Sequence, residues 1–247
     1  MIPVASFTSY EAKRSVGFIA FVEISKYDLF STIMSQVYGG ISKENTFTNK
    51  AVNETRGEIL TFKDMPALTM FHSNSGGMCA GIDEVWEIEI PYLTTHRDDY
   101  SNNQPPFRWI SGMPKRKIKE KLNTFGLNFK EIKKIVTIRK SKSGRVSTLK
   151  IIGKNTELFL NGNSFRLMVT PYLIKSTKFQ VEDTGKNFIF SGKGFGHGVG
   201  MSQWGACMMA KSGHTYKEIL KFYYPDTSLS KIPDVDGGQL SDPGERQ

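Results

Sequence analysis

The chain has 247 residues, which corresponds to one large domain or two small ones and can bury a core without disulfides or a metal. Hydrophobic residues make up 38% and charged residues 23%, a composition that excludes disordered, fibrous and membrane-spanning proteins. Lysine and arginine outnumber aspartate and glutamate by 33 to 24, a net charge of +9. This excess suggests an anionic partner, such as nucleic acid, anionic lipid or a charged polymer.

The positive charge is concentrated in one segment. Between Pro114 and Lys154 there are fourteen lysines and arginines against only Glu120 and Glu131, a local charge of +12. The other residues therefore sum to about −3. A solvated charged face is the simplest explanation, and an electrostatic clamp on an anionic polymer is the functional one.

The first half of the chain alternates between helical and irregular patterns. Apolar spacing predicts helices at 11–24 and 27–37, and strands at 57–62 and 67–71 that form a hairpin across 63–66. Glycines and small polar residues predict an irregular loop at 73–81, and prolines predict a long coil at 91–114. No apolar run reaches 18 residues, and Val16–Val22 lacks a cleavage site, so we expect neither a spanning helix nor an export signal in this chain.

The second half is richer in strands. A helix is predicted at 115–122, strands at 132–138, 146–152, 157–160, 178–181 and 188–191, and helices at 201–211 and 216–223. Glycine, proline and charged residues beyond 232 predict a frayed tail. Helices and hairpins without βαβ alternation indicate an α+β fold.

The most informative stretch runs from Gly192 to Gly205. Glycine occupies every second position from 192 to 200, which clears one face of an extended segment for close approach of a backbone or ligand. His197 lies within it, and Ser202, Gln203 and Trp204 open the next helix. This set resembles a floor that binds saccharide or peptide; the alternative is a tight turn around a buried histidine. No phosphate-loop pattern is present.

A second cluster lies at 71–77, where a strand runs into a glycine loop. His72 is followed by Ser73 and Ser75, but neither serine lies in a G-x-S-x-G elbow. We therefore do not expect a serine nucleophile. We also expect no metal site, because His72 and Cys79 are too few ligands; Cys79 and Cys207 form no disulfide framework.

Taken together, these motifs resemble the SpoIID/LytB family of stage II sporulation protein D and amidase enhancers, over about residues 10 to 230. The resemblance rests on 194–206 with Ala210-Lys, Gly213, Tyr216, Ile219-Leu220 and Tyr223-Tyr-Pro225, and upstream on 35–40, Asn49, Ala51-Val52, Thr55, Gly57, 71–73, 75–77, Val85-Trp86 and 91–93. It implies action on bacterial peptidoglycan, outside the cytoplasm.

The resemblance implies two functions. One is a lytic transglycosylase that cuts glycan strands already stripped of stem peptides, in which one carboxyl group acts first as acid and then as base. The other is a wall-binding protein without catalysis that enhances an amidase. The family's catalytic glutamate would align at Met1, Ile2 or before them, so no catalytic residue is assigned. Glu11 matches a different family position, and Glu54 and Glu84 are interpreted as surface or structural residues.

We expect the 72–77 and 197–204 segments to converge on one cleft. The predicted substrate-binding residues are Gln36, Tyr38, His72, Ser73, Ser75, Gly76, Gly77, Trp86, His197, Gly198, Ser202, Gln203 and Trp204. Trp204 would stack on sugar rings, while His197 and Gln203 would form hydrogen bonds. Expected partners are peptidoglycan glycan strands and an amidase or other wall hydrolase, with no nucleic acid. No cofactor is expected, because zinc at His72 and Cys79 lacks a second nearby cysteine.

The predicted architecture is a single SpoIID-like domain over 1–232, with a tail at 233–247. It would have a mostly antiparallel β core, flanking helices and a basic hairpin insertion at 114–154. Wall polymer is preferred to nucleic acid as a partner of this insertion, because no RNP-like or zinc-finger motif accompanies its charge.

Overall fold

The structure is a computed structural model that describes residues 42, 44–86, 88–105, 107–154 and 156–231. The chain divides into two compact units, which are described separately. The first combines residues up to 69 with those from 227 onward, and the second is Met70–Asp226. The helices predicted at 11–24 and 27–37 and the tail beyond 232 lie outside the described residues.

The described part of the first unit contains an α-helix and a small antiparallel sheet. Its elements are α2 (Thr46–Glu54), β1 (Glu58–Phe62), β2 (Met65–Pro66) and β13 (Ser228–Lys231). β1 is the middle strand, between β13 and β2. The predicted hairpin is therefore shorter than expected: the chain turns at Lys63 and Asp64, both with positive φ, and 67–71 does not extend it.

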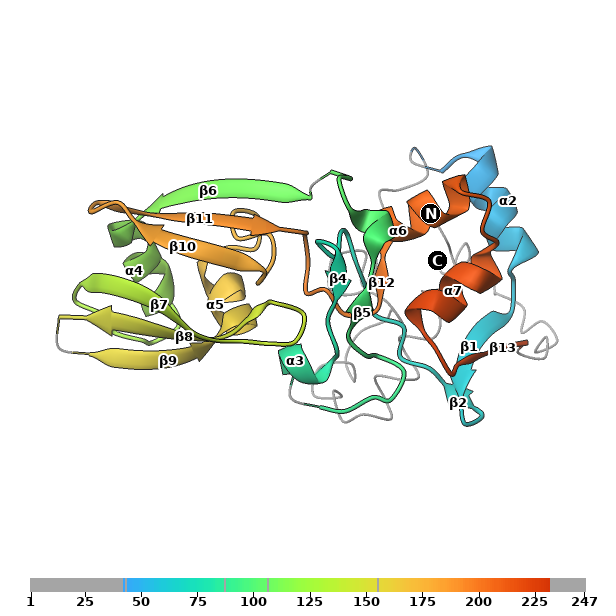
Figure 1. Ribbon diagram of the computed structural model, residues 1–247, viewed down its shortest axis with the longest axis horizontal. Helices are drawn as coiled ribbons and strands as arrows, with labels where there is room; N and C mark the ends of the chain where they lie inside the picture. The colour runs from blue at the N-terminus through green and yellow to red at the C-terminus, as the bar shows by residue number, and fades with distance from the viewer. Residues whose placement is uncertain (1–41, 43, 87, 106, 155, 232–247) are drawn as a thin grey trace, which may run out of the picture. The chain divides into compact units, whose positions relative to one another are not determined.

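The larger part of the second unit has two three-stranded antiparallel sheets with two helices between them (Figure 1). One sheet has the order β10 (Phe179–Asp183), β11 (Asn187–Lys193), β6 (Arg108–Pro114). The other has the order β7 (Ile132–Lys140), β8 (Val146–Gly153), β9 (Glu157–Asn161). The helices are α4 (Lys115–Asn123) and α5 (Gly162–Val169).

Both helices bury residues spaced four apart. Ile118 and Leu122 of α4, and Phe165 and Val169 of α5, are almost fully buried and belong to one hydrophobic cluster with both sheets. The basic segment is thus not an appended hairpin. Its apolar residues contribute to the same core as β6, β10 and β11, and its charged side chains are exposed or partly exposed except that of Arg145, which is buried.

One strand of this core lies where the sequence predicts coil. β6 occupies the end of the 91–114 stretch and pairs with β11 from Arg108–Lys193 to Pro114–Asn187. Its inward side chains, Trp109 and Met113, are buried. The prolines that suggest coil lie before the strand or at its last position.

The rest of the second unit carries short strands and helices. These are β3 (Phe71–His72), β4 (Met78–Cys79), α3 (Asp83–Trp86), β5 (His96–Arg97), a 3₁₀ turn (Asp99–Ser101), β12 (Met201–Ser202), α6 (Gln203–Lys211) and α7 (Tyr216–Tyr223). β3 pairs in parallel with β12, and β4 pairs antiparallel with β5. Helices and mostly antiparallel strands in small sheets confirm the α+β class.

No helix within the described ranges is long and apolar enough to cross a membrane.

Candidate functional site

The loop after β3 and the glycine segment (residues 192–200) lie backbone to backbone in the second unit. Asn74 N donates to the carbonyl oxygen of Phe195 at 3.1 Å, and Ala80 N donates to that of Gly198 at 2.8 Å. Two isolated bridges, Asn74–Phe195 (antiparallel) and Ala80–Val199 (parallel), lie beside the parallel β3–β12 pairing. The close backbone approach that the alternating glycines predict is therefore present.

The conformation of the glycine segment differs from the extended one expected. Gly194, Gly196, Gly198 and Gly200 have φ of +78°, +110°, +90° and +69°, so the chain enters the left-handed region at every second residue. Side chains other than hydrogen are strained there. Contact adds to this requirement: a β-carbon at Gly196 would lie 2.7 Å from that of His72. The segment is a series of turns pressed against its neighbours.

Three rings from three segments meet at His197. Its imidazole centre lies 5.6 Å from that of His72, with the planes at 63°, and 5.2 Å from the indole of Trp86 in α3, with the planes at 59°. His72 is buried, while Trp86 and His197 are partly exposed. The structure thus brings His197 to two residues, His72 and Trp86, that lie more than a hundred positions before it in the sequence.

Both imidazoles are neutral at physiological pH. Burial lowers the pKa of His72 well below its ordinary value, and His197 and Arg145 lower it further. Burial also lowers the pKa of His197 to about 3, with Arg166 and Arg145 adding to the shift. Two uncharged rings beside an indole form a surface suited to the apolar faces of a sugar rather than to proton transfer.

The ring nitrogens are engaged mainly with the backbone. His72 Nδ1 lies 3.1 Å from the carbonyl oxygen of Val199, and His197 Nδ1 accepts from Val199 N at 3.0 Å. His72 Nε2 is buried without a partner among the described residues. Val199 therefore orients both imidazoles, and His72 Nε2 is the ring nitrogen left unsatisfied in the site.

Arg145 is a site residue that the sequence did not indicate. It is 2% exposed, and its guanidinium donates to the carbonyl oxygens of Met78 at 2.8 Å and Ser75 at 2.7 Å. It also packs against Gly198, where a β-carbon would overlap it. Burial lowers its pKa. This arginine from the basic segment holds the two motif loops together, and because the contact is long-range, no local pattern signals it.

Glu84 of α3 is hydrogen-bonded to the turn between β7 and β8, which directly precedes Arg145. Its carboxylate accepts hydrogen bonds from the hydroxyls of Ser141, Ser143 and Thr95. Burial alone would raise the pKa of Glu84, but these hydrogen bonds outweigh it and hold the pKa below the ordinary value. Glu84 is therefore an ionised structural group, in agreement with its interpretation from the sequence.

The remaining predicted residues have mostly local partners. Trp204 N donates to the carbonyl oxygen of Ser73 at 3.0 Å, Ser75 Oγ bonds Ser101 Oγ, and Ser202 Oγ caps α6 by accepting from Gly205 N at 3.2 Å. Gly76 N donates to Asn74 Oδ1, Gly77 N donates to Ser75 Oγ, and Gln203 is exposed. Gln36 and Tyr38 lie outside the described residues.

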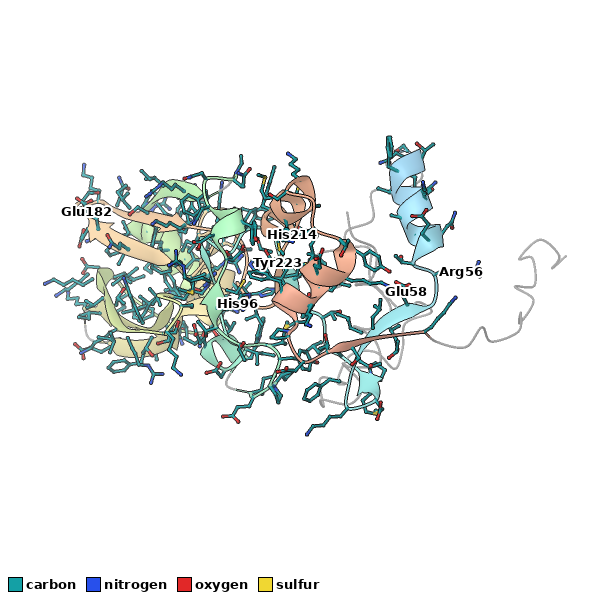
Figure 2. The ribbon with its side chains drawn as sticks, turned by 45° about the vertical axis from the view of Figure 1, so that its right-hand side comes forward. Arg56, Glu58, His96, Glu182, His214 and Tyr223 are labelled. Carbon is teal, nitrogen blue, oxygen red and sulfur yellow. The ribbon has the colours of Figure 1, made fainter. Side chains whose placement is uncertain are left out.

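A buried polar layer supports these loops. Tyr223 donates to Asp98 Oδ1 at 3.1 Å, and its ring centre lies 6.0 Å from that of His96 (Figure 2). A β-carbon at Gly205 would overlap the Tyr223 hydroxyl, so α6 approaches closely. Asp98 is fully buried and is therefore closed to a large ligand in this conformation.

A zinc ion does not fit the side chains beside His72. Cys79 Sγ donates to the carbonyl oxygen of Gly200 at 3.5 Å, and no three His, Cys, Asp or Glu side chains of the described ranges are grouped to hold a metal. That the protein needs no cofactor stays a prediction.

Comparisons with known proteins agree with the motifs. A family profile described as "Stage II sporulation protein" matches residues 4–62, and one described as "Domain of unknown function (DUF8618)" matches residues 87–200. The chain is an α+β protein with a glycine-lined site, and it belongs to the SpoIID/LytB family.

Individual relatives are 28% to 33% identical to it over the aligned residues. Stage II sporulation protein D of Bacillus subtilis (strain 168) is 31% identical over 73% of this chain and 50% of its own length. The Amidase enhancer of the same organism is 28% identical over 81% of this chain and 34% of its own. An uncharacterized protein of Brachyspira hyodysenteriae (strain ATCC 49526 / WA1) is 33% identical over 80% and 52%. The chain thus spans about half or less of these relatives.

Proposed function

We propose that this protein acts outside the cytoplasm on bacterial cell-wall peptidoglycan and binds its glycan strands at the partly exposed Trp86 and His197 rings, which the buried His72 ring supports. The observation that carries the proposal is the meeting of these rings, two of them neutral imidazoles, beside bare glycine backbone. Flat apolar rings with few polar groups are typical of saccharide sites. The relatives named for sporulation and amidase enhancement support a role at the cell wall.

Strand cleavage as a lytic transglycosylase is the first candidate activity. It needs one carboxyl group that can donate a proton. Glu84 is held ionised by three hydroxyls and Asp98 is buried beneath Tyr223, so neither suits this role. A catalytic acid would come from outside the described residues, where the family's glutamate aligns.

Enhancement of an amidase without cleavage is the second candidate. The engagement of Glu84 and Asp98 favours it, because the described part of the site then binds a strand without supplying the acid. In this role the protein would hold glycan strands for a separate wall hydrolase.

The test is incubation of the chain with peptide-free glycan strands, followed by a pull-down and by mass spectrometry for anhydro-muramic products. Products identify a transglycosylase; binding without products, together with faster release of peptides by an added amidase, identifies an enhancer. Trp86→Ala and His197→Ala should each weaken binding at least about fivefold, the effect of losing about 1 kcal/mol of ring contact. Tyr172→Ala removes an exposed aromatic ring elsewhere and should bind as wild type. Retention of full affinity by both ring variants would refute the site.

A further inference from the structure

Three cations and two phenyl rings border the glycine segment. Lys193 Nζ and Arg108 Cζ lie 5.6 and 5.5 Å from the centre of the Phe107 ring, and Lys175 Nζ lies 5.9 Å from that of Phe195. These are cation–π distances. All five side chains are at least partly exposed. Arg108, Lys175 and Lys193 are called the cationic rim below.

The rim is fixed to the backbone that carries the ring site. Gly194 N donates to the carbonyl oxygen of Phe107, and Gly196 N donates to that of Lys175, both at 2.8 Å. Since Gly196 directly precedes His197, the backbone of Lys175 is bonded one residue away from the ring site. A polymer that occupied the ring site would also pass the rim.

The charge of the rim is not neutralised within the described chain. None of its three cations forms a salt bridge with a described carboxylate. By contrast, Lys115, Arg116 and Lys150 of the basic segment pair with Asp183, Glu120 and Glu157. Three of the fourteen cations of the basic segment are thus paired with a carboxylate, whereas none of the three rim cations is among the described salt bridges.

Two more cations behind the rim add to its potential. Lys178 donates to the carbonyl oxygen of Gly76 at 3.1 Å, and the Arg145 guanidinium donates to the carbonyl oxygens of Met78 and Ser75. Burial, then repulsion by Arg145 and Lys193, lowers the pKa of Lys178 to about 8. The repulsion from these two cations outweighs the attraction that Glu84 exerts on Lys178, so positive charge predominates behind the rim.

We propose that the cationic rim binds carboxylate groups of the glycan strand held at the neighbouring ring site. This inference rests on the proposed function. Muramic acid carries a lactyl carboxylate that becomes free when the stem peptide is removed, so a peptide-free strand presents one anion on each disaccharide. Phe107 and Phe195 offer apolar surface to the sugar, and the rim cations face its carboxylates. The rim is then what distinguishes acidic strands from neutral ones.

A phosphate polymer could present similar charge without sugar rings. The Phe107 and Phe195 rings favour a glycan strand over a phosphate polymer as the ligand, because a polyphosphate chain has no apolar face to pack against them. The test therefore includes inorganic polyphosphate as a competitor.

The test compares wild type with Lys175→Gln/Lys193→Gln on peptide-free strands and on the same strands after conversion of their carboxyls to neutral amides. Wild type should bind the acidic strands about tenfold more tightly than the amidated ones, and the advantage should shrink as salt is raised. The rim variant should bind both alike, at the wild-type affinity for amidated strands. Lys117→Gln/Lys121→Gln removes equal charge from the exposed face of α4 and should keep the wild-type preference.

Each other outcome decides against the proposal. A rim variant that still prefers acidic strands, or a wild type that binds both strands equally, overturns the rim while leaving the ring site intact. Displacement of strands by polyphosphate as effectively as by free acidic strands shows a general anion site and overturns the carboxylate assignment. Absence of wild-type binding to either strand overturns the rim together with the proposed function.

Discussion

Gly198 lies where the two motif loops and the basic segment meet. Its φ of +90° is unfavourable for any residue with a side chain, and a β-carbon there would overlap the Arg145 guanidinium. Arg145 cannot withdraw without breaking its bonds to Ser75 and Met78. The residue is therefore constrained both by its conformation and by its contact.

Gly198→Ala should accordingly cost more stability than the conformation alone explains. Gly213 is the matched control, because its φ is +92° and nothing lies within 4 Å of its β-carbon position. We expect Gly213→Ala to lower the free energy of unfolding by about 1 kcal/mol. Gly198→Ala should lower it by about 2 kcal/mol more than Gly213→Ala does. Urea unfolding measures both. Equal losses would mean that Arg145 does not brace the glycine segment.

The role of a single residue could be predicted from the sequence where that role depends on its sequence neighbours. The glycine alternation indicates a close backbone approach, which is present, but it suggests an extended chain, whereas positive φ recurs at every second residue. Glycine permits both conformations, so the spacing cannot choose between them. Arg145 could not be found, because its partners lie about 70 positions away.

Elements with their own strong local signals were placed well. The expected helices at 115–122 and 216–223 correspond to α4 and α7; the second begins with a capping box between Thr215 and Glu218. β6 was missed, because prolines dominate the stretch before it and its strand pairing depends on β11. The hairpin at 57–71 was mispaired in part, because β3 finds its partner in β12, about 130 residues later.

The link between α3 and the β7–β8 turn should be sensitive to acid. The pKa of Glu84 is depressed in the folded protein, so its carboxylate stabilises the fold above about pH 4.5, the ordinary value, and this stabilisation is lost as the pH falls through the lower folded value. Glu84→Gln should reduce stability near pH 7 and flatten its fall below about 4.5.

The measurement is urea unfolding at a series of pH values from 7 to 3. Glu120→Gln, on the exposed face of α4, removes a carboxylate of the same type and should follow the wild-type curve more closely. An acid dependence unchanged by Glu84→Gln would show that the three hydroxyls do not stabilise the ionised form.

At the scale of the whole molecule, the segment with most of the positive charge, residues 114–154, also supplies many of the buried core residues. Residues 114–154 carry the +12 excess, yet Ile118, Leu122, Leu149 and Ile151 in that segment are fully buried in the cluster shared with β10 and β11. Composition indicates the outward charge. It does not indicate that the segment's inner face completes the second unit and delivers Arg145 to the site.

The second unit should therefore unfold cooperatively, as a single unit. Leu149→Ala removes a fully buried side chain from β8 and should lower the free energy of unfolding by about 2–5 kcal/mol. Because one core joins the sheets and Arg145 directly precedes β8, amide exchange should accelerate by the same factor in the β7–β8 sheet and in the β11 strand that leads into the glycine segment.

Hydrogen exchange followed by mass spectrometry resolves these regions separately. Phe125→Ala truncates a residue of the same segment that is 56% exposed, and it should change stability by less than about 0.5 kcal/mol. Acceleration confined to β7–β9, with β11 and the glycine segment protected as in wild type, would mean that the basic segment folds as an independent insertion. Uniform acceleration would show that the stability of the candidate site depends on the segment that carries most of the positive charge.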